Sequence, residues 1–209
     1  MSPLFEVENL AYGTPHGRLL QENLQFTLNS RELLLITGGN GCGKSTLLRV
    51  LLGKMSPHRG TIRRELPLES VAYIPQLENT EVHLPLTLRD VLAISQKHLD
   101  WAKALSFGLL NKEHLNRAWN TASGGERKRT LLTRALLQNP AILILDEPFN
   151  HLDEKSRDAM AQAMVNFLIP TDSPRAIIMV SHQGLGAREE KLFKVVPVPL
   201  LGEDKGEAT

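Results

Sequence analysis

The feature that most constrains the fold of this chain is a glycine-rich segment between an apolar run and a helix-forming run. The segment follows residues 33–36, precedes residues 47–52 and reads Gly38-Gly39-Asn40-Gly41-Cys42-Gly43-Lys44-Ser45-Thr46. A strand, a glycine turn and a helix in this order form a phosphate-binding loop, because glycines let successive backbone N–H groups surround an anion at the positive end of the helix. Lys44 adds a mobile cation for the outer phosphates, and the Ser45 hydroxyl can ligate Mg²⁺. The segment therefore predicts a nucleotide-binding site.

Length and composition allow one substantial core and indicate no unusual partner. The chain has 209 residues and a formal net charge of +1, so its overall charge gives no reason to expect nucleic acid. Its apolar runs are shorter than the roughly 18–20 residues needed to cross a bilayer, which excludes a membrane channel. Residues 1–6 lack a basic start followed by an apolar core, so no export signal is expected. The one cysteine, Cys42, cannot form an internal disulfide, which suits the cytoplasm.

The first half of the chain predicts short strands and then a helical segment. Residues 4–10 alternate in a way typical of an edge strand, whereas the uniformly apolar residues 33–37 suit a buried central strand. Gly53 is placed to end the helix that starts at the phosphate loop, and Thr87 with Asp90 resembles a helix-starting capping box. Further strands are expected at 24–28, 60–63 and 71–74, and a helical insertion at 77–122, with helices near 87–97, 99–107 and 111–118.

The second half alternates strands with helices. Pro197 and Pro199 are expected to end regular structure, and the polar residues 202–209 to form a tail. Such alternation predicts an α/β fold, in which a mostly parallel sheet is covered by helices on both faces. The expected organisation is one domain over residues 1–201 that contains the helical insertion. The elements predicted here are helices at 124–138 and 154–168 and strands at 141–145, 175–181 and 191–196.

Two acidic residues follow the apolar strand expected at 141–145. A carboxylate at the carboxyl end of a buried strand can meet Mg²⁺ beside a phosphate loop, which is the role expected of Asp146. Glu147 is then placed to polarise a water against the terminal phosphate, as a general base. The alternative is a strand that simply meets a polar loop.

Because of the phosphate loop and these two acids, the chain resembles the nucleotide-binding domain of the ABC ATPases, and the resemblance covers nearly its whole length. The family's further motifs are a glutamine, a signature sequence, a loop after the catalytic glutamate and a switch histidine, and all occur in order. They correspond to Gln76, Ser123-Gly124-Gly125-Glu126, Asn150-His151-Leu152-Asp153 and His182. Upstream of the phosphate loop, Tyr12 matches the aromatic residue that stacks on adenine.

The resemblance implies a P-loop NTPase fold with N-terminal antiparallel strands, and it implies an ATPase that uses ATP and Mg²⁺. Residues 38–46 would bind the nucleotide, and Glu147 with His182 and Gln76 would act in hydrolysis. The Mg²⁺ ligands implied in the same way are Ser45, Gln76 and Asp146.

The resemblance also implies a dimer. In the family, the phosphate loop and the signature lie at opposite ends of one subunit, so neither subunit surrounds ATP alone. Two copies would pair head to tail, and the signature of each, residues 123–126, would cap the nucleotide held by Lys44 of the other. Asp153, which is also expected among the nucleotide-binding residues, would lie at the dimer seam and couple the two sites.

Several of these residues also have plain structural interpretations. Ser123 and Glu126 match a helix-capping pattern, which is compatible with anion binding at the same helix end. Tyr12 could pack in a strand as tyrosines commonly do. Cys42 could be oxidant-sensitive near a helix N-terminus, although a position that accepts any small side chain is the simpler interpretation. The basic residues 127–129 are interpreted as a solvated or nucleotide-adjacent helix face.

The chain departs from the family pattern at four positions. Ala122 stands where leucine is usual, Glu126 where glutamine is commoner, Gly39 where proline is frequent and Gln183 where aspartate is common. None of these changes removes a catalytic group, so an active ATPase is expected.

Three functions are compatible with these motifs. The first is the ATP-binding subunit of a transporter, peripheral on the inner face of the cell membrane, with separate permease subunits and possibly a solute-binding protein in the same system. The spacing of residues 73–76 and 84–87 is similar to ATPases of zinc and manganese importers. A permease would dock beside residues 77–91, whose exposed-looking apolar side chains are Val82, Leu84, Leu86 and Leu88.

The second function is a soluble ABC protein that acts on ribosomes, to which residues 147–153 are similar, although those proteins usually carry two fused domains. The third is a non-enzymatic nucleotide switch, against which Glu147 and His182 argue. Small cytochrome-maturation ATPases that handle haem export are a further variant of the transport class. No direct contact with nucleic acid is expected.

Overall fold

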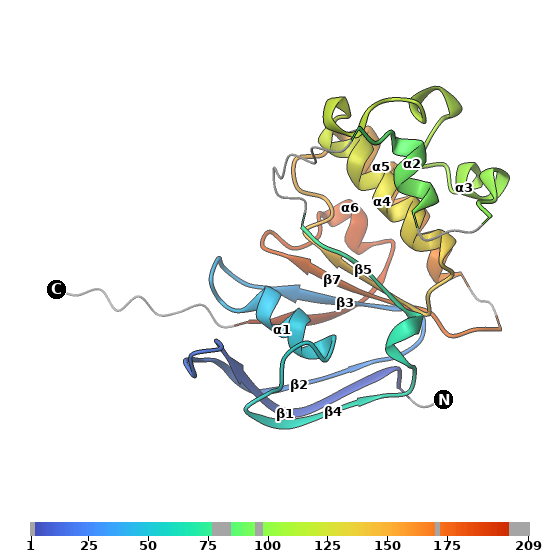
Figure 1. Ribbon diagram of the computed structural model, residues 1–209. Coiled ribbons are helices and arrows are strands. Elements are labelled where there is room, and N and C mark those ends of the chain that lie inside the picture. Colours follow the sequence, from blue (N-terminus) through green and yellow to red (C-terminus); the bar gives the residue numbers. More distant parts are fainter. Residues whose placement is uncertain (1–2, 77–84, 95–97, 170–171, 201–209) are drawn as a thin grey trace.

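The computed structural model describes residues 3–76, 85–94, 98–169 and 172–200, which form two sheets and a set of helices (Figure 1). The antiparallel sheet, in the order β2-β1-β4, contains β1 (Phe5–Gly13), β2 (Leu19–Leu28) and β4 (Arg59–Arg64). The parallel sheet, in the order β5-β6-β7-β3-β8, contains β3 (Glu32–Thr37), β5 (Val71–Ile74), β6 (Ile142–Asp146), β7 (Ala176–Ser181) and β8 (Lys194–Pro199). The predicted α/β fold is confirmed.

Helices lie on both faces of the parallel sheet. Figure 1 shows α1 (Lys44–Leu51) between the two sheets, whereas α4 (Gly124–Leu137) and α5 (Glu154–Leu168) lie on the other side of the parallel sheet. Gly53, with φ of 67°, follows α1 as predicted. The remaining helices are α2 (Leu88–Ala93), α3 (Trp101–Ser106) and the short α6 (Ala187–Glu190), with single 3₁₀ turns at η1 (Leu68–Ser70), η2 (Lys112–His114) and η3 (Trp119–Thr121).

The parallel strands are apolar on both faces because each face packs on a separate core. Along β3, Leu33 and Leu35 enter the core with α4 and α5, whereas Leu34 and Ile36 enter the core that contains α1 and the antiparallel sheet. Side chains of a strand alternate between its faces, so a run of apolar residues is what a sheet covered on both sides requires. Because these strands are parallel, their carboxyl ends lie at the same edge of the sheet, and the loops that carry the candidate site begin there.

The expectation of an edge strand at residues 4–10 is wrong. β1 lies between β2 and β4, and it pairs antiparallel with both. Phe5, Val7 and Leu10 are buried against the α1 side of the molecule, whereas Glu8 is exposed. Alternation of this kind reports that one face of a strand is buried, which a central strand of an antiparallel sheet also satisfies.

The two prolines near residue 198 do not end regular structure, because they lie within β8. Leu200 N–H donates to Thr37 O (2.7 Å), which continues the pairing of β8 with β3. Since backbone N–H groups alternate in direction along a strand, the nitrogens of Pro197 and Pro199 face away from β3. β8 is the edge strand, so no hydrogen bond of the sheet is lost there.

Only two of the three helices expected in the insertion form. The predicted capping box is present at the start of α2, where Asp90 N–H donates to Thr87 Oγ1 (3.2 Å). Residues 111–118 form only the turn η2, because their N–H groups donate to carbonyls three residues earlier, as from His114 to Asn111 O (3.1 Å) and from Arg117 to His114 O (3.0 Å). The end of this segment bonds to the start of α2, from Leu88 N–H to Arg117 O (3.0 Å) and from Arg89 N–H to Leu115 O (2.9 Å).

The apolar surface expected for permease docking is smaller than predicted. Leu88 is 0% exposed and packs with Val91 and Trp119, and Leu86 is partly buried against the same small core. Val82 and Leu84, like residues 202–209 of the predicted tail, lie outside the described residues.

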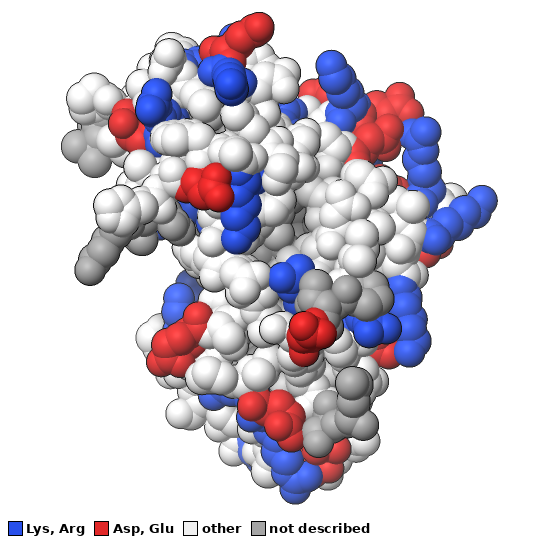
Figure 2. All heavy atoms as spheres, turned by 90° about the vertical axis from the view of Figure 1, so that its right-hand side faces the viewer, with Lys and Arg blue, Asp and Glu red and all other residues white. Residues whose placement is uncertain are grey.

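The described part of the chain contains no helix whose length and apolar character would suit a bilayer. On the face shown in Figure 2, basic and acidic side chains are interspersed. That face therefore offers no broad region of a single charge, in keeping with the net charge of +1.

Glu32 ties β3 to its neighbours at the end opposite the phosphate loop. Its carboxylate accepts from Lys194 Nζ (2.6 Å) and from Asn29 N–H (2.8 Å), and the residue is 3% exposed. Burial alone would raise the pKa of Glu32, but the hydrogen bonds from Lys194 and Asn29 outweigh it and hold the pKa below its ordinary value.

We expect Glu32→Gln to lower the free energy of unfolding at pH 7 by about 1–2 kcal/mol, because the charge-assisted bonds are lost. A carboxyl with a depressed folded-state pKa stabilises the fold above its unfolded pKa and loses that effect as pH falls through the folded value. The difference between the two proteins should therefore fade below about pH 4 in urea titrations. Glu6→Gln, which disrupts the exposed pair with Arg63, is the matched control and should cost less than about 0.5 kcal/mol.

Candidate nucleotide-binding and catalytic site

The phosphate loop joins the buried strand β3 to α1, as the sequence predicts. Gly43 precedes α1 with φ of 99°, and no side chain caps this helix end, so the first-turn N–H groups remain available to an anion. A Cβ at Gly43 would lie 3.2 Å from Tyr12 Cε2, so both the backbone angle and the space favour glycine. Lys44 Nζ donates across the loop to the carbonyls of Gly38 (2.8 Å) and Gly39 (2.9 Å).

The predicted catalytic and metal-binding residues meet in one cavity of about 290 Å³ at the carboxyl edge of the parallel sheet. Its lining is strongly polar and comes from the phosphate loop, the start of α1, the segment after β5 and the segments that follow β6 and β7. Among the predicted residues it contains Asn40, Gly41, Lys44, Ser45, Gln76, Asp146, Glu147 and His182, and it also contains Asn150. The sequence prediction did not assign Asn150 to the site, although it lies in the family loop that was recognised.

Asp146 points toward α1 because of its position in β6. It has the same parity as Ile142 and Ile144, whose side chains enter the core shared with α1. Tyr73 Oη donates to Asp146 Oδ2 (3.4 Å), a contact that the sequence did not predict. Burial, followed by the charge of Glu147, raises the pKa of Asp146 above its ordinary value.

The donor set beside Lys44 fits Mg²⁺. The Ser45 hydroxyl, the Gln76 amide and the Asp146 carboxylate line the same cavity, and they supply the hard oxygen ligands that this cation prefers. A divalent cation there would also offset the repulsion between the neighbouring acids that raises the pKa of Asp146.

Glu147 is held in an uncommon backbone conformation. Its φ is 50°, and its N–H donates to Val180 O (3.0 Å), one pairing step beyond β6. The residue is 6% exposed, and its Oε2 lies 3.3 Å from Nδ1 of the half-exposed His182. A left-handed conformation costs energy for a residue other than glycine, and such residues concentrate at functional sites. The geometry thus places the expected base and the switch histidine in contact.

The basic residues 127–129 are not a solvated helix face. Arg127 donates to the carbonyls of Trp119 (2.9 Å) and Asn120 (2.8 Å). Arg129 donates to Leu109 O (3.0 Å) and contacts Ser156 Oγ. Lys128, between them, donates to carbonyls of the loop after β6. Each residue instead anchors a different backbone segment, and Lys128 agrees with the nucleotide-adjacent interpretation because Glu147 and Asn150 line the polar cavity.

Tyr12 does not provide the surface expected for stacking on adenine. Its side chain is 0% exposed within the core that contains α1, and burial raises its pKa above the ordinary value. Leu20 and Gly43 pack against this part of the molecule, so the packing alternative describes Tyr12. Cys42 is likewise 2% exposed, which favours the simple role of a small side chain over that of a reactive thiol.

The signature residues lie at the start of α4 and do not line the phosphate cavity of their own chain. Ser123 and Gly124 are exposed, and Ser123 Oγ accepts from Glu126 N–H (3.2 Å) in the predicted capping box. Glu126 is 5% exposed, and its carboxylate accepts from Ser123 N–H (2.8 Å) and from Arg117. Glu126 therefore holds the signature turn within its own chain, and its assignment as a ligand of the partner's nucleotide stays a prediction.

Asp153 also lies outside the cavity, where it caps α5. Its carboxylate accepts from Ser156 N–H (2.8 Å) and Ser156 Oγ (2.8 Å). These bonds to the Ser156 backbone and side chain lower the pKa of Asp153. Its role at a dimer seam stays a prediction.

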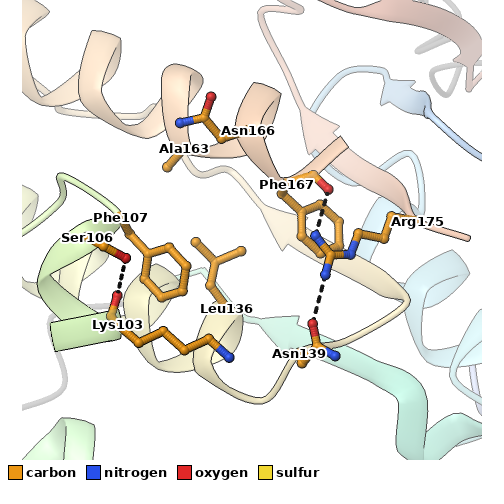
Figure 3. Close-up of a pocket in the computed structure, with 9 residues that line it drawn as sticks. All are labelled: Lys103, Ser106, Phe107, Leu136, Asn139, Ala163, Asn166, Phe167 and Arg175. Carbon is orange, nitrogen blue, oxygen red and sulfur yellow. Dashed lines mark hydrogen bonds between the residues drawn. The ribbon is translucent and has the colours of Figure 1, made fainter. Parts of the chain in front are cut away.

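A second cavity, of about 320 Å³, lies near the amino end of β7 (Figure 3). Lys103 and Arg175 project toward a wall that includes Phe107 and Phe167, and Arg175 donates to Asn139 Oδ1 (2.8 Å). None of the predicted site residues lines this cavity. The similar size of the two cavities shows that the chemistry of the lining, and not volume, identifies the candidate nucleotide site.

Comparisons with known proteins give consistent results. A family model described as ABC transporter matches residues 21–150. A zinc import ATP-binding protein of Aliivibrio fischeri is 36% identical over 165 residues, which are 77% of this chain and 62% of that protein. A zinc import ATP-binding protein of Acinetobacter baylyi is 35% identical over 179 residues, 86% of this chain and 68% of that protein. The chain thus spans less than two thirds of the Aliivibrio protein.

A solved structure of the ATP-binding subunit of an ABC transporter has the same fold. Its TM-score with this chain is 0.75 at 24% sequence identity, and the match covers 95% of this chain and 88% of the other. The shared architecture agrees with the two sheets and the flanking helices described above.

Proposed function

This chain belongs to the ABC transporter family, and we propose that it binds and hydrolyses ATP in a head-to-tail dimer to drive transport through a separate membrane permease. The observation that carries the proposal is the polar cavity at the carboxyl edge of the parallel sheet. This cavity brings together the phosphate loop, the Asp146 carboxylate as a candidate Mg²⁺ ligand, the Glu147 carboxylate as a candidate general base, and His182. These are the parts that phosphoryl transfer from a nucleotide requires.

Each residue of the cavity has a distinct task in the proposed reaction. Lys44 and the free N–H groups of α1 bind the outer phosphates. Glu147 orients the attacking water and accepts its proton, while His182 holds the Glu147 carboxylate and faces the terminal phosphate. Ser45, Gln76 and Asp146 would hold Mg²⁺, which neutralises phosphate charge when it is bound.

The position of the signature supports the dimer. Ser123 and Gly124 are exposed at the start of a capped helix, yet they lie outside the cavity of their own chain. A helix start with two glycines suits an anion. Because these residues lie outside the cavity of their own chain, the anion would have to come from another molecule. A second copy of the chain would supply it through the nucleotide on Lys44, as in the head-to-tail pairing that the family resemblance implies.

The relatives make a metal-ion importer the first transport system to test. Both Aliivibrio and Acinetobacter proteins are named for zinc import. In such a system this chain would be peripheral on the inner face of the cell membrane, with permease subunits and a solute-binding protein as partners. The ATP-binding subunit itself would not touch the cargo.

Two measurements test the proposal. The purified full chain should release phosphate from Mg²⁺-ATP and should form dimers with ATP in light scattering, and absence of both would refute it. Gentle purification of the tagged chain from its own cells should recover a hydrophobic permease. Recovery of ribosomes in its place would favour the alternative of a soluble ABC protein in translation.

A further inference from the structure

Lys128 connects α4 to the loop that carries the expected catalytic base. Its Nζ donates to Glu147 O (3.0 Å) and to Asn150 O (2.7 Å). Both carbonyls belong to the segment that follows β6, whereas α4 packs on the opposite face of the parallel sheet from α1. One side chain therefore links α4 directly to the backbone of the loop that carries Glu147.

The segment held by Lys128 is strained. Glu147 and His151 have φ values of 50° and 58°, and both are residues other than glycine. Such a conformation is unfavourable for a residue other than glycine and persists only where surrounding contacts determine it. The two bonds from Lys128 fall within this strained segment, one of them on the carbonyl of Glu147 itself. Lys128 thus fixes the backbone from which the Glu147 carboxylate projects toward His182.

The half-buried position of Lys128 costs desolvation free energy that a solvent-exposed lysine would not lose. Burial lowers the pKa of Lys128, which forms no ion pair within the described residues. A desolvated ammonium is expensive unless hydrogen bonds satisfy it, and here carbonyl oxygens do so. Arg127 and Arg129, on either side, bond to other segments, so the contact with the catalytic loop is specific to Lys128.

Lys128 also lies close to the signature along a rigid helix. Gly124 begins α4, and Lys128 follows it by four residues, about one helical turn or 6 Å. The capping box at Ser123 and Glu126 fixes this end of the helix. A displacement of the signature would therefore displace Lys128 by a similar distance, because both lie in the same helix.

We propose that Lys128 is a positioning residue that couples the signature of one chain to the catalytic carboxylate of the same chain. Contact of residues 123–125 with the nucleotide of the partner copy would shift α4, and Lys128 would transmit the shift to the carbonyl of Glu147. Each site would thereby respond to occupation of the other. The inference rests on the proposed ATPase dimer and adds the group that links its two sites.

The test compares substitutions that separate positioning from folding. Lys128→Met keeps the aliphatic stem but loses the donors, and we expect kcat to fall about 10- to 100-fold, with the Kd for a fluorescent ATP analogue within about twofold of wild type. Lys128→Arg retains several donors and should recover most of the loss. Arg175→Met, which removes hydrogen bonds from a half-buried cation far from the site, should leave kcat unchanged.

A double-mutant cycle with Glu147→Gln makes the test specific. If Lys128 acts through Glu147, adding Lys128→Met to Glu147→Gln should change the residual single-turnover rate by less than about twofold. Equal losses in the two backgrounds would overturn the inference, as would a folded Lys128→Met protein with wild-type kcat. If Lys128→Met does not fold, Lys128→Gln serves in the same cycle. An inactive wild-type chain would refute the proposed function instead, so the two failures are distinguishable.

Discussion

Glu147→Gln should slow ATP hydrolysis about 100- to 1,000-fold and leave ATP trapped between two copies of the chain. The amide has the shape of the carboxylate but does not accept a proton from the attacking water. Burial at 6% exposure leaves little room for a solvent base to replace it. The phosphate loop is untouched, so binding and pairing should persist. Phosphate release under multiple-turnover conditions and light scattering in ATP measure the two effects.

Glu154→Gln is the matched control for this variant. Glu154 lies on α5 with its side chain 84% exposed, and it pairs with Arg188 away from the cavity. Its replacement should leave both turnover and dimer lifetime unchanged. A Glu147→Gln protein that turns over at the wild-type rate would remove Glu147 from the role of base.

Lys44→Ala should weaken ATP binding by about 100-fold, because a charge-assisted contact with the outer phosphates is lost at a site that has few other cations. Lys44 is the basic residue in the lining of the cavity, which also contains two acids. A titration with a fluorescent ATP analogue measures the change. Lys112→Ala, at an exposed position on η2, controls for the loss of one positive charge.

The thermal midpoint of the Lys44→Ala protein also needs to be compared with that of the wild type, because Lys44 bonds to the carbonyls of Gly38 and Gly39. A similar midpoint with weakened binding supports direct contact with phosphate. Unchanged affinity would contradict the assignment of residues 38–46 as the phosphate loop.

The sequence predicted best those features that short segments determine. The phosphate loop, the capping boxes at Thr87 and Ser123 and the helix at 154–168 depend on neighbours within a few residues, and each is present. The meeting of Lys44 with Asp146 was also predictable. It follows from the rule that parallel strands bring their carboxyl ends to one edge.

Tertiary contacts explain the features that were missed. The helix expected at 111–118 is replaced by the 3₁₀ turn η2, and the end of this segment bonds to the start of α2. Pro197 and Pro199 are tolerated because β8 happens to be an edge strand. Tyr12 is covered by packing that no local pattern indicates. The left-handed conformation of Glu147 is equally invisible in sequence, since glycine would be the usual signal for it.

The role of Lys128 shows why charge patterns alone mislead. Three consecutive basic residues on a helix indicate a solvated or nucleotide-adjacent face, yet residues 127–129 contact three separate backbone segments, and only Lys128 bonds to a segment that lines the polar cavity. A long side chain can bury its stem and carry its charge to a partner on another element. Only the tertiary arrangement identifies the partner of Lys128 as the loop that carries Glu147.

A mixing experiment tests most directly whether one chain's signature completes the other chain's ATP site. Lys44→Ala removes the cation expected to bind the phosphates, whereas Gly124→Asp places a carboxylate at the signature. An added Cβ at Gly124 meets no atom within 4 Å, so the fold should be kept. Each variant alone should be inactive. An equal mixture should recover up to about a quarter of wild-type ATPase activity, because half of the dimers are mixed and each has one intact composite site. A mixture as inactive as its components would contradict the shared site.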